Sequence, residues 1–116
     1  MKKIFLCAII IATAGSAAAT GQDLTSDVSK ASKMAKDYAQ VAGAALFCRF
    51  EKDAIEEYIV LAQAKINQTA KDREDKIIAK MDFTNSMIVA STRAPNEGCD
   101  KFKDTFRLQN RVIEKS

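Results

Sequence analysis

Residues 28–46, VSKASKMAKDYAQVAGAAL, decide the fold class, because their apolar positions recur at intervals of three and four. This spacing places the apolar side chains on one face of an α-helix. The stripe consists of Val28, Ala31, Ala35, Tyr38, Ala42 and Leu46. Since most of these residues are alanines, we expect a neighbouring helix to approach closely. Glycine has a low helical propensity, so Gly43 is a weak point at which this helix could end or bend.

The same spacing in the rest of the chain predicts further helices. The four predicted helices cover residues 26–46, 51–66, 70–92 and 99–114. Thr25 or Ser26 is expected to cap the first helix, because a hydroxyl can accept a hydrogen bond from a free backbone N–H. The polar residues 67–76 either contain a turn or form the solvated part of one long helix, and a turn near 67–69 is favoured. Pro95 marks the loop before the last helix.

The apolar residues of the later helices define the sides on which they are expected to pack. The second helix carries Ala54, Ile55, Tyr58, Ile59, Ala62 and Ile66 along one side. The third carries Ile77, Ile78, Met81, Phe83, Met87, Ile88 and Val89. The buried side of the last helix is predicted to consist of Phe102, Phe106, Gln109, Val112 and Ile113. The chain therefore has enough apolar stripes for a bundle.

These elements predict an all-α protein, a small bundle of four helices (between three and five) in up-and-down order. The whole chain has four glycines and one proline, fewer turn-forming residues than a β-rich domain of this size needs. Cys48 lies near the end of the first helix and Cys99 near the start of the fourth. If successive helices alternate in direction, both cysteines lie at the same end of the bundle and can form one disulfide.

The first nineteen residues have the pattern of a secretory signal peptide. Lys2 and Lys3 precede the apolar, uncharged residues 4–14, and Ala17 and Ala19 provide the small side chains at a cleavage site. The alternative is a membrane anchor, but a helix of eleven residues spans only about half of a ~30 Å hydrocarbon core. We therefore expect cleavage after residue 19 and a bacterial protein that is periplasmic or secreted.

Cleavage would change the properties of the chain. Residues 20–116 form one predicted domain, and the loss of Lys2 and Lys3 without any acidic residue lowers the net charge from +3 to +1. A nearly neutral domain does not suggest nucleic acid or an anionic membrane as a partner. Two cysteines remain, Cys48 and Cys99, and in an oxidising compartment they are expected to pair. The alternatives are two free thiols or a disulfide to a partner.

Catalytic and metal-binding groups are scarce. The chain has no histidine, the commonest general base and metal ligand, and it lacks nucleophile, phosphate-binding and zinc motifs. We therefore predict no enzymatic activity, no catalytic residue, no cofactor and no metal site. Glu51, Asp53, Glu56 and Glu57 could bind a cation, but they are better interpreted as solvated residues in the first turns of a helix, where the dipole favours acids.

The aromatic residues near Cys48 have two interpretations. Phe47, Phe50 and Tyr58 could line a small pocket, or they could form the core around the disulfide. The second interpretation is favoured, because aromatic residues at helical spacing usually belong to the core.

The resulting functional hypothesis is a secreted or periplasmic protein that acts through protein–protein interaction, as an inhibitor, an immunity or exclusion factor, or a small chaperone. In size and architecture it is similar to acid-stress periplasmic chaperones and to helical immunity proteins of contact-dependent toxin systems, a similarity of class that no motif carries. The alternative is a periplasmic bundle that binds a small ligand or an ion. The partner and the oligomeric state do not follow from the sequence.

Overall fold

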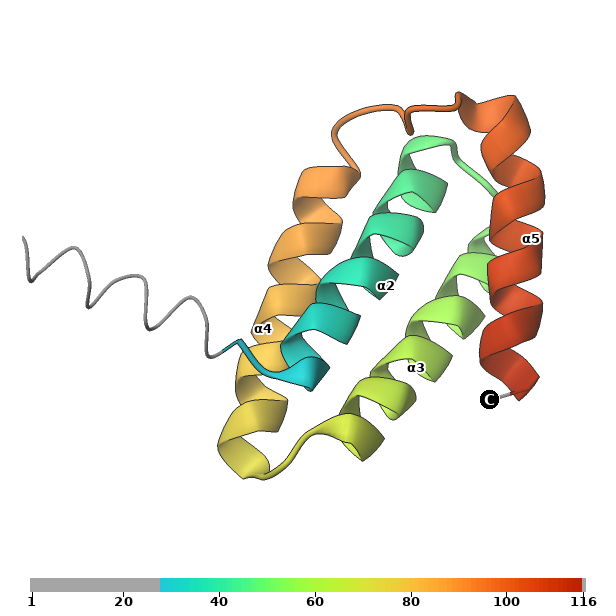
Figure 1. Cartoon of the computed structure of the whole chain (residues 1–116). Helices are drawn as coiled ribbons and strands as arrows, with labels where there is room; N and C mark the ends of the chain where they lie inside the picture. Colours follow the sequence, from blue (N-terminus) through green and yellow to red (C-terminus); the bar gives the residue numbers. More distant parts are fainter. Residues whose placement is uncertain (1–27, 116) are drawn as a thin grey trace, which may run out of the picture.

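A computed structural model describes residues 28–115, and α-helices are the only regular secondary structure in this part of the chain. Its four helices are α2 (Lys30–Phe47), α3 (Lys52–Thr69), α4 (Arg73–Ala90) and α5 (Cys99–Lys115). Successive helices alternate in direction (Figure 1), so the predicted up-and-down bundle is confirmed. The predicted signal peptide and its cleavage residues Ala17 and Ala19 lie outside the described residues.

The central helix is α2, which packs against both α3 and α4. Its alanines at positions 31, 35, 39, 42 and 45 have no exposed surface, as expected for a helix that its neighbours approach closely. Gly43 does not end α2, which continues to Phe47. A Cβ atom at Gly43 would meet the Cβ of Ala90 and would lie 2.6 Å from the carbonyl oxygen of Met87. The glycine is therefore the point at which α4 contacts the backbone of α2.

The first helix begins four residues later than predicted. Its N-cap is Ser29, whose Oγ accepts a hydrogen bond of 3.1 Å from the backbone N–H of Ser32. The predicted caps, Thr25 and Ser26, are outside the described residues, and the helix does not extend back to them. The helix begins at Lys30 because Ser29 satisfies one of its free N–H groups.

A short turn separates α3 from α4, so the two segments do not form one long helix. The turn lies at residues 70–72, slightly later than predicted. Asp72 caps α4 by accepting a hydrogen bond of 2.9 Å from the N–H of Asp75, and the Asp75 carboxylate accepts one of 2.9 Å from the N–H of Lys71. These reciprocal bonds resemble a capping box and fix the start of α4.

Asp75 also connects the starts of two helices. The Ser29 hydroxyl and the Lys71 N–H both donate hydrogen bonds to its carboxylate, which lowers the pKa of Asp75 below its usual value. Because hydrogen bonds to the charged form favour ionisation, this buried carboxylate stabilises the packing of α2 on α4 at neutral pH.

The core combines small residues of α2 with large residues of the other helices. Tyr58 and Ile66 of α3 and Phe83 of α4 are the largest fully buried side chains. Several predicted core positions are wrong. Leu46 is 41% exposed and Val112 is 54% exposed. Five apolar residues on which α4 was expected to pack are also exposed, namely Ile77, Ile78, Met81, Ile88 and Val89. Val112 adjoins the buried Ile113, and neighbouring residues point in directions about 100° apart around a helix, so only one of them reaches the core.

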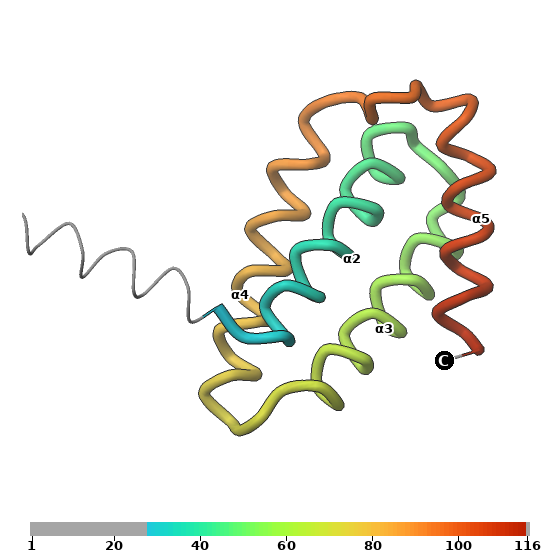
Figure 2. The backbone as a smooth tube through the Cα atoms, in the orientation of Figure 1, coloured from blue at the N-terminus to red at the C-terminus, as the bar shows by residue number. Residues whose placement is uncertain are grey.

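The four helices do not close into a ring around one core. Helices α4 and α5 are consecutive in the chain but make no contact, and α2 and α3 lie between them (Figure 1). The connection at residues 91–98 crosses the end of α2 (Figure 2). Gly98 ends this connection with φ of 87°, a conformation that side chains other than glycine rarely adopt. As a result, no helix within residues 28–115 covers one long side of α4.

None of the helices within residues 28–115 is long and apolar enough to cross a membrane.

Candidate functional site

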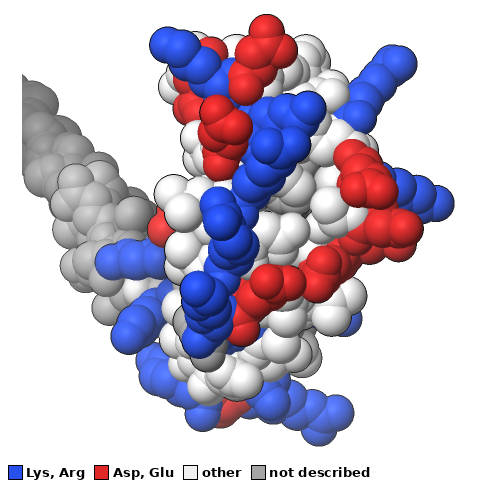
Figure 3. Space-filling view, turned by 90° about the vertical axis from the view of Figure 1, so that its right-hand side faces the viewer, with Lys and Arg blue, Asp and Glu red and all other residues white. Residues whose placement is uncertain are grey.

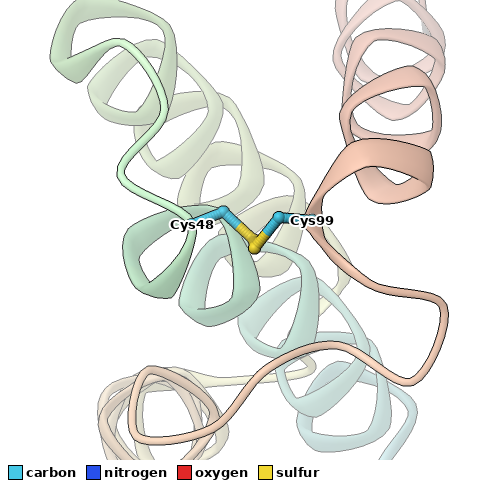
Figure 4. Close-up of a disulfide and its surroundings, with 2 residues drawn as sticks. All are labelled: Cys48 and Cys99. Atoms are coloured by element: carbon cyan, nitrogen blue, oxygen red, sulfur yellow. A yellow bond between two sulfur atoms is a disulfide. The ribbon is translucent and has the colours of Figure 1, made fainter.

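The disulfide joins the end of α2 to the beginning of α5 (Figure 4). The Sγ atoms of Cys48 and Cys99 are 2.05 Å apart and the Cα atoms are 5.6 Å apart. The predicted pairing is therefore confirmed. The other predicted outcomes, two free thiols or a disulfide to a partner, do not describe this structure.

Arg49 follows the disulfide in an unusual backbone conformation. Its φ is 57°, in the left-handed region that glycine normally occupies at the end of a helix. The N–H of Arg49 bonds to the carbonyl of Leu46, and the N–H of Phe50 bonds to that of Ala45, as in a Schellman motif. This turn reverses the chain and directs Phe50 toward α5.

Behind the disulfide lies a cluster of four aromatic rings from three segments. The rings of Phe50 and Phe102 are stacked with centroids 5.9 Å apart, and Phe106 lies 5.6 Å from both Phe50 and Tyr58. The predicted pair of Phe102 and Phe106 is present, at 6.4 Å. Together with the disulfide, these contacts hold α5 against α3.

Tyr58 is the buried end of this cluster. It has no exposed surface, and its hydroxyl has no hydrogen-bond partner among the described residues. Burial raises the pKa of Tyr58 far above its usual value, with a smaller contribution from the nearby Tyr38. The side chain therefore acts as a core residue whose polar atom is unsatisfied.

A groove of about 600 Å³ lies beside the disulfide, between the start of α3 and α5. It is lined by Cys48, Arg49, Phe50, Glu51, Ala54, Cys99, Asp100, Lys103, Phe106, Arg107 and Asn110. The Oδ1 atom of Asn110 is buried without a hydrogen-bond partner among the described residues. The groove thus combines an aromatic floor with charged edges of both signs.

The structure does not bring the three predicted pocket residues together at one cavity. Phe50 lines the groove, Tyr58 lies in the core, and Phe47 is 40% exposed and is absent from the groove lining. The groove is instead completed by Lys103, Arg107 and other residues of α5. Their participation depends on the contact between α3 and α5, which local spacing does not reveal.

The four acidic residues at the start of α3 are exposed, as expected of solvated groups. Among residues 28–115, no three or more His, Cys, Asp or Glu side chains lie close enough together to hold a metal ion. Glu57 interacts with Glu114 of α5, and this side-chain hydrogen bond, together with the nearby charge, raises the pKa of Glu57. The pair makes the contact between α3 and α5 sensitive to pH.

The side of the molecule that carries α5 has mixed charge. Lys and Arg side chains form a column on this side, with Asp and Glu beside it (Figure 3). Both signs of charge are therefore present side by side on this face (Figure 3). This side is therefore typical of a solvated surface.

The outer side of α4 is the most apolar exposed surface among the described helices. Five of its large apolar residues are between 51% and 58% exposed. They are Ile77, Ile78, Met81, Ile88 and Val89. Its buried side is formed instead by Asp75, Ala79, Phe83 and Ala90. A clustered apolar surface of this kind usually marks an interaction site.

The sequence analysis missed this surface, although a signal for it was present. Phe83 and Ala90 share one helical side with Ala79, at intervals of four and seven residues. Ile77 and Ile88 lie on the other side, and their hydropathy alone suggested burial.

No protein-family model, no curated protein and no solved structure matched this chain.

Proposed function

We propose that this protein is a secreted or periplasmic bacterial protein that acts by binding another protein through the outer side of α4, without catalysing a reaction. The observation that carries the proposal is the exposure of five large aliphatic side chains on one helix. Exposing them to water is unfavourable by about 25 cal/mol for each Å² of apolar surface, and a partner that covers them recovers this free energy.

Two further features support the proposal. The disulfide between Cys48 and Cys99 is typical of proteins in oxidising compartments. The chain has no histidine, and its disulfide leaves neither Cys48 nor Cys99 as a thiol nucleophile. An inhibitor, an immunity or exclusion factor and a small chaperone are the roles that fit a small stable bundle with an apolar contact surface.

The test is cross-linking in the cells that produce the protein, followed by identification of the captured proteins. The wild type is compared with Ile88→Lys on α4 and with Leu108→Lys on α5. These residues are 56% and 55% exposed, so the two variants disturb solvation equally. We expect a partner that the wild type and Leu108→Lys capture and that Ile88→Lys loses. A partner captured equally by all three proteins, or none, would contradict the proposal.

The groove beside the disulfide supports a second candidate function, the binding of a small ligand. The specific observation is a groove of about 600 Å³ whose lining includes the aromatic rings of Phe50 and Phe106 and the polar side chain of Asn110, a combination of apolar and polar groups that suits a small ligand. Native mass spectrometry of protein purified from its own cells tests this function. We expect an added mass that Asn110→Ala reduces, and a clean mass of the protein alone would refute the hypothesis.

A further inference from the structure

The exposed residues of α4 follow a heptad pattern. Moving along the helix in alternating steps of four and three residues gives one line of exposed positions. They are Glu74, Ile78, Met81, Asn85 and Ile88. A line of this kind is the seam along which one helix packs against another in a coiled coil. The seam lies on the opposite side of α4 from the buried Phe83. At its N-terminal end, Glu74 and Ile78 also line a pocket with residues of α2.

Four exposed apolar residues in and beside the seam are arranged symmetrically about Phe83, the buried residue near the middle of α4. Ile78 and Ile88 each lie five residues from it, and Ile77 and Val89 each lie six residues from it. If two copies of α4 pack antiparallel, with Phe83 at the same level in both, Ile78 of one copy is level with Ile88 of the other. A two-fold interface requires this kind of self-complementary surface.

The polar residues do not oppose this pairing. Met81 is level with Asn85 across the same seam, and Glu74 at one end is level with the uncharged Thr92. Lys80, the only exposed charged residue between positions 77 and 92, lies on the side of α4 that faces α3, where it lines a pocket with Gln63 and Ile66. No two like charges are therefore level with each other between positions 74 and 92.

From this symmetry we infer that a second copy of this chain occupies the outer side of α4, in an antiparallel pair centred on Phe83. The inference rests on the proposed function, since it names the occupant of the same surface. It differs in predicting self-association without any other protein.

The size of the surface sets the strength of the pairing. A helix of 18 residues is about 27 Å long and about 10–12 Å wide, so the contact strip covers roughly 300 Å² on each copy. Stable interfaces bury about 800 Å² on each partner. The dimer is therefore weak and depends on protein concentration.

Sedimentation equilibrium of the purified, oxidised protein between about 5 µM and about 1 mM tests the inference. We expect reversible association to a dimer. Ile78→Lys and Ile88→Lys should each weaken it at least tenfold, while the equally exposed control Leu108→Lys should leave it unchanged. Circular dichroism of each variant checks that the helices are retained.

A pair of double variants tests the antiparallel arrangement itself. Ile78→Lys combined with Ile88→Glu places opposite charges at the same level in the two copies, so it should restore association. Ile78→Lys combined with Ile88→Lys places like charges there and should not. Failure of this difference to appear would overturn the antiparallel pairing.

Two other outcomes would also overturn the inference. One is a monomer at every concentration, and the other is an association that Leu108→Lys weakens as much as Ile88→Lys does. If the protein is monomeric but Ile88→Lys abolishes the capture of a different protein in cells, the proposed function stands and the second copy is excluded as the occupant.

Discussion

Replacing Gly43 by alanine should destabilise the protein, although alanine is the better helix former. In an unobstructed helix, the change from glycine to alanine stabilises by about 1 kcal/mol. At Gly43 the new Cβ would lie 2.6 Å from the carbonyl oxygen of Met87 and 3.0 Å from the nitrogen of Ser91, besides meeting the Cβ of Ala90. Two of these neighbours are backbone atoms and the third is a Cβ atom. None of them can therefore move away by rotation about a side-chain bond.

The magnitude follows from the balance of these two effects. Overpacking a close contact costs roughly 1–3 kcal/mol, and the rigid neighbours place this contact in the upper part of that range. After the gain in helical propensity, the free energy of unfolding should fall by about 1–2 kcal/mol. For a domain of this size, the melting temperature should fall by roughly 4–16 °C.

Urea unfolding followed by circular dichroism measures the change directly. Ala64→Gly, at an exposed position of α3, provides the matched control, because it reports the helical propensity difference alone. We expect it to cost about 1 kcal/mol. If Gly43→Ala were more stable than the wild type by a similar amount, the close approach of α2 and α4 at this glycine would be refuted.

Three other variants test the stability of the contact between α3 and α5. Replacing Cys48 and Cys99 by alanine should lower the free energy of unfolding by about 4 kcal/mol, because the disulfide closes a loop with a sequence separation of 51. A urea unfolding curve that is the same for the variant and the wild type would contradict this. Tyr58→Phe should raise the melting temperature, because it removes a buried hydroxyl without a hydrogen-bond partner, whose burial costs roughly 1–3 kcal/mol. A lower melting temperature for the variant would reveal a hydrogen bond to that hydroxyl. Glu114→Gln should remove the pH dependence of stability that comes from Glu57. Because Glu114 raises the pKa of Glu57, the stability from this pair is greatest below the usual carboxylate pKa and is lost as pH rises through the raised value. Unfolding at low salt between about pH 4 and pH 7 checks this, and a wild type that gained stability over that interval relative to Glu114→Gln would oppose it.

The candidate sites were only partly predictable. The disulfide followed from two positions that alternating helices bring to one end of the bundle. The groove beside it did not, because Lys103, Arg107 and Asn110 join it only when α5 packs on α3. The outer surface of α4 was missed for a related reason. Ile77 and Ile88 resemble core residues in the sequence, and only the position of α2 shows that Phe83 and Ala90 face inward instead.

By itself, the sequence determined the helical class, the number of helices and the pairing of Cys48 with Cys99. The helices depend on local spacing of apolar residues. The pairing follows because alternating helices bring Cys48 and Cys99 to the same end of the bundle, although they are far apart in the sequence. The tertiary structure decided which side of each helix is buried. Gly43 allows α2 and α4 to approach each other closely, and the chain then carries α5 to the far side of α3. A whole side of α4 is consequently left exposed, because burial depends on neighbours that are distant in the sequence.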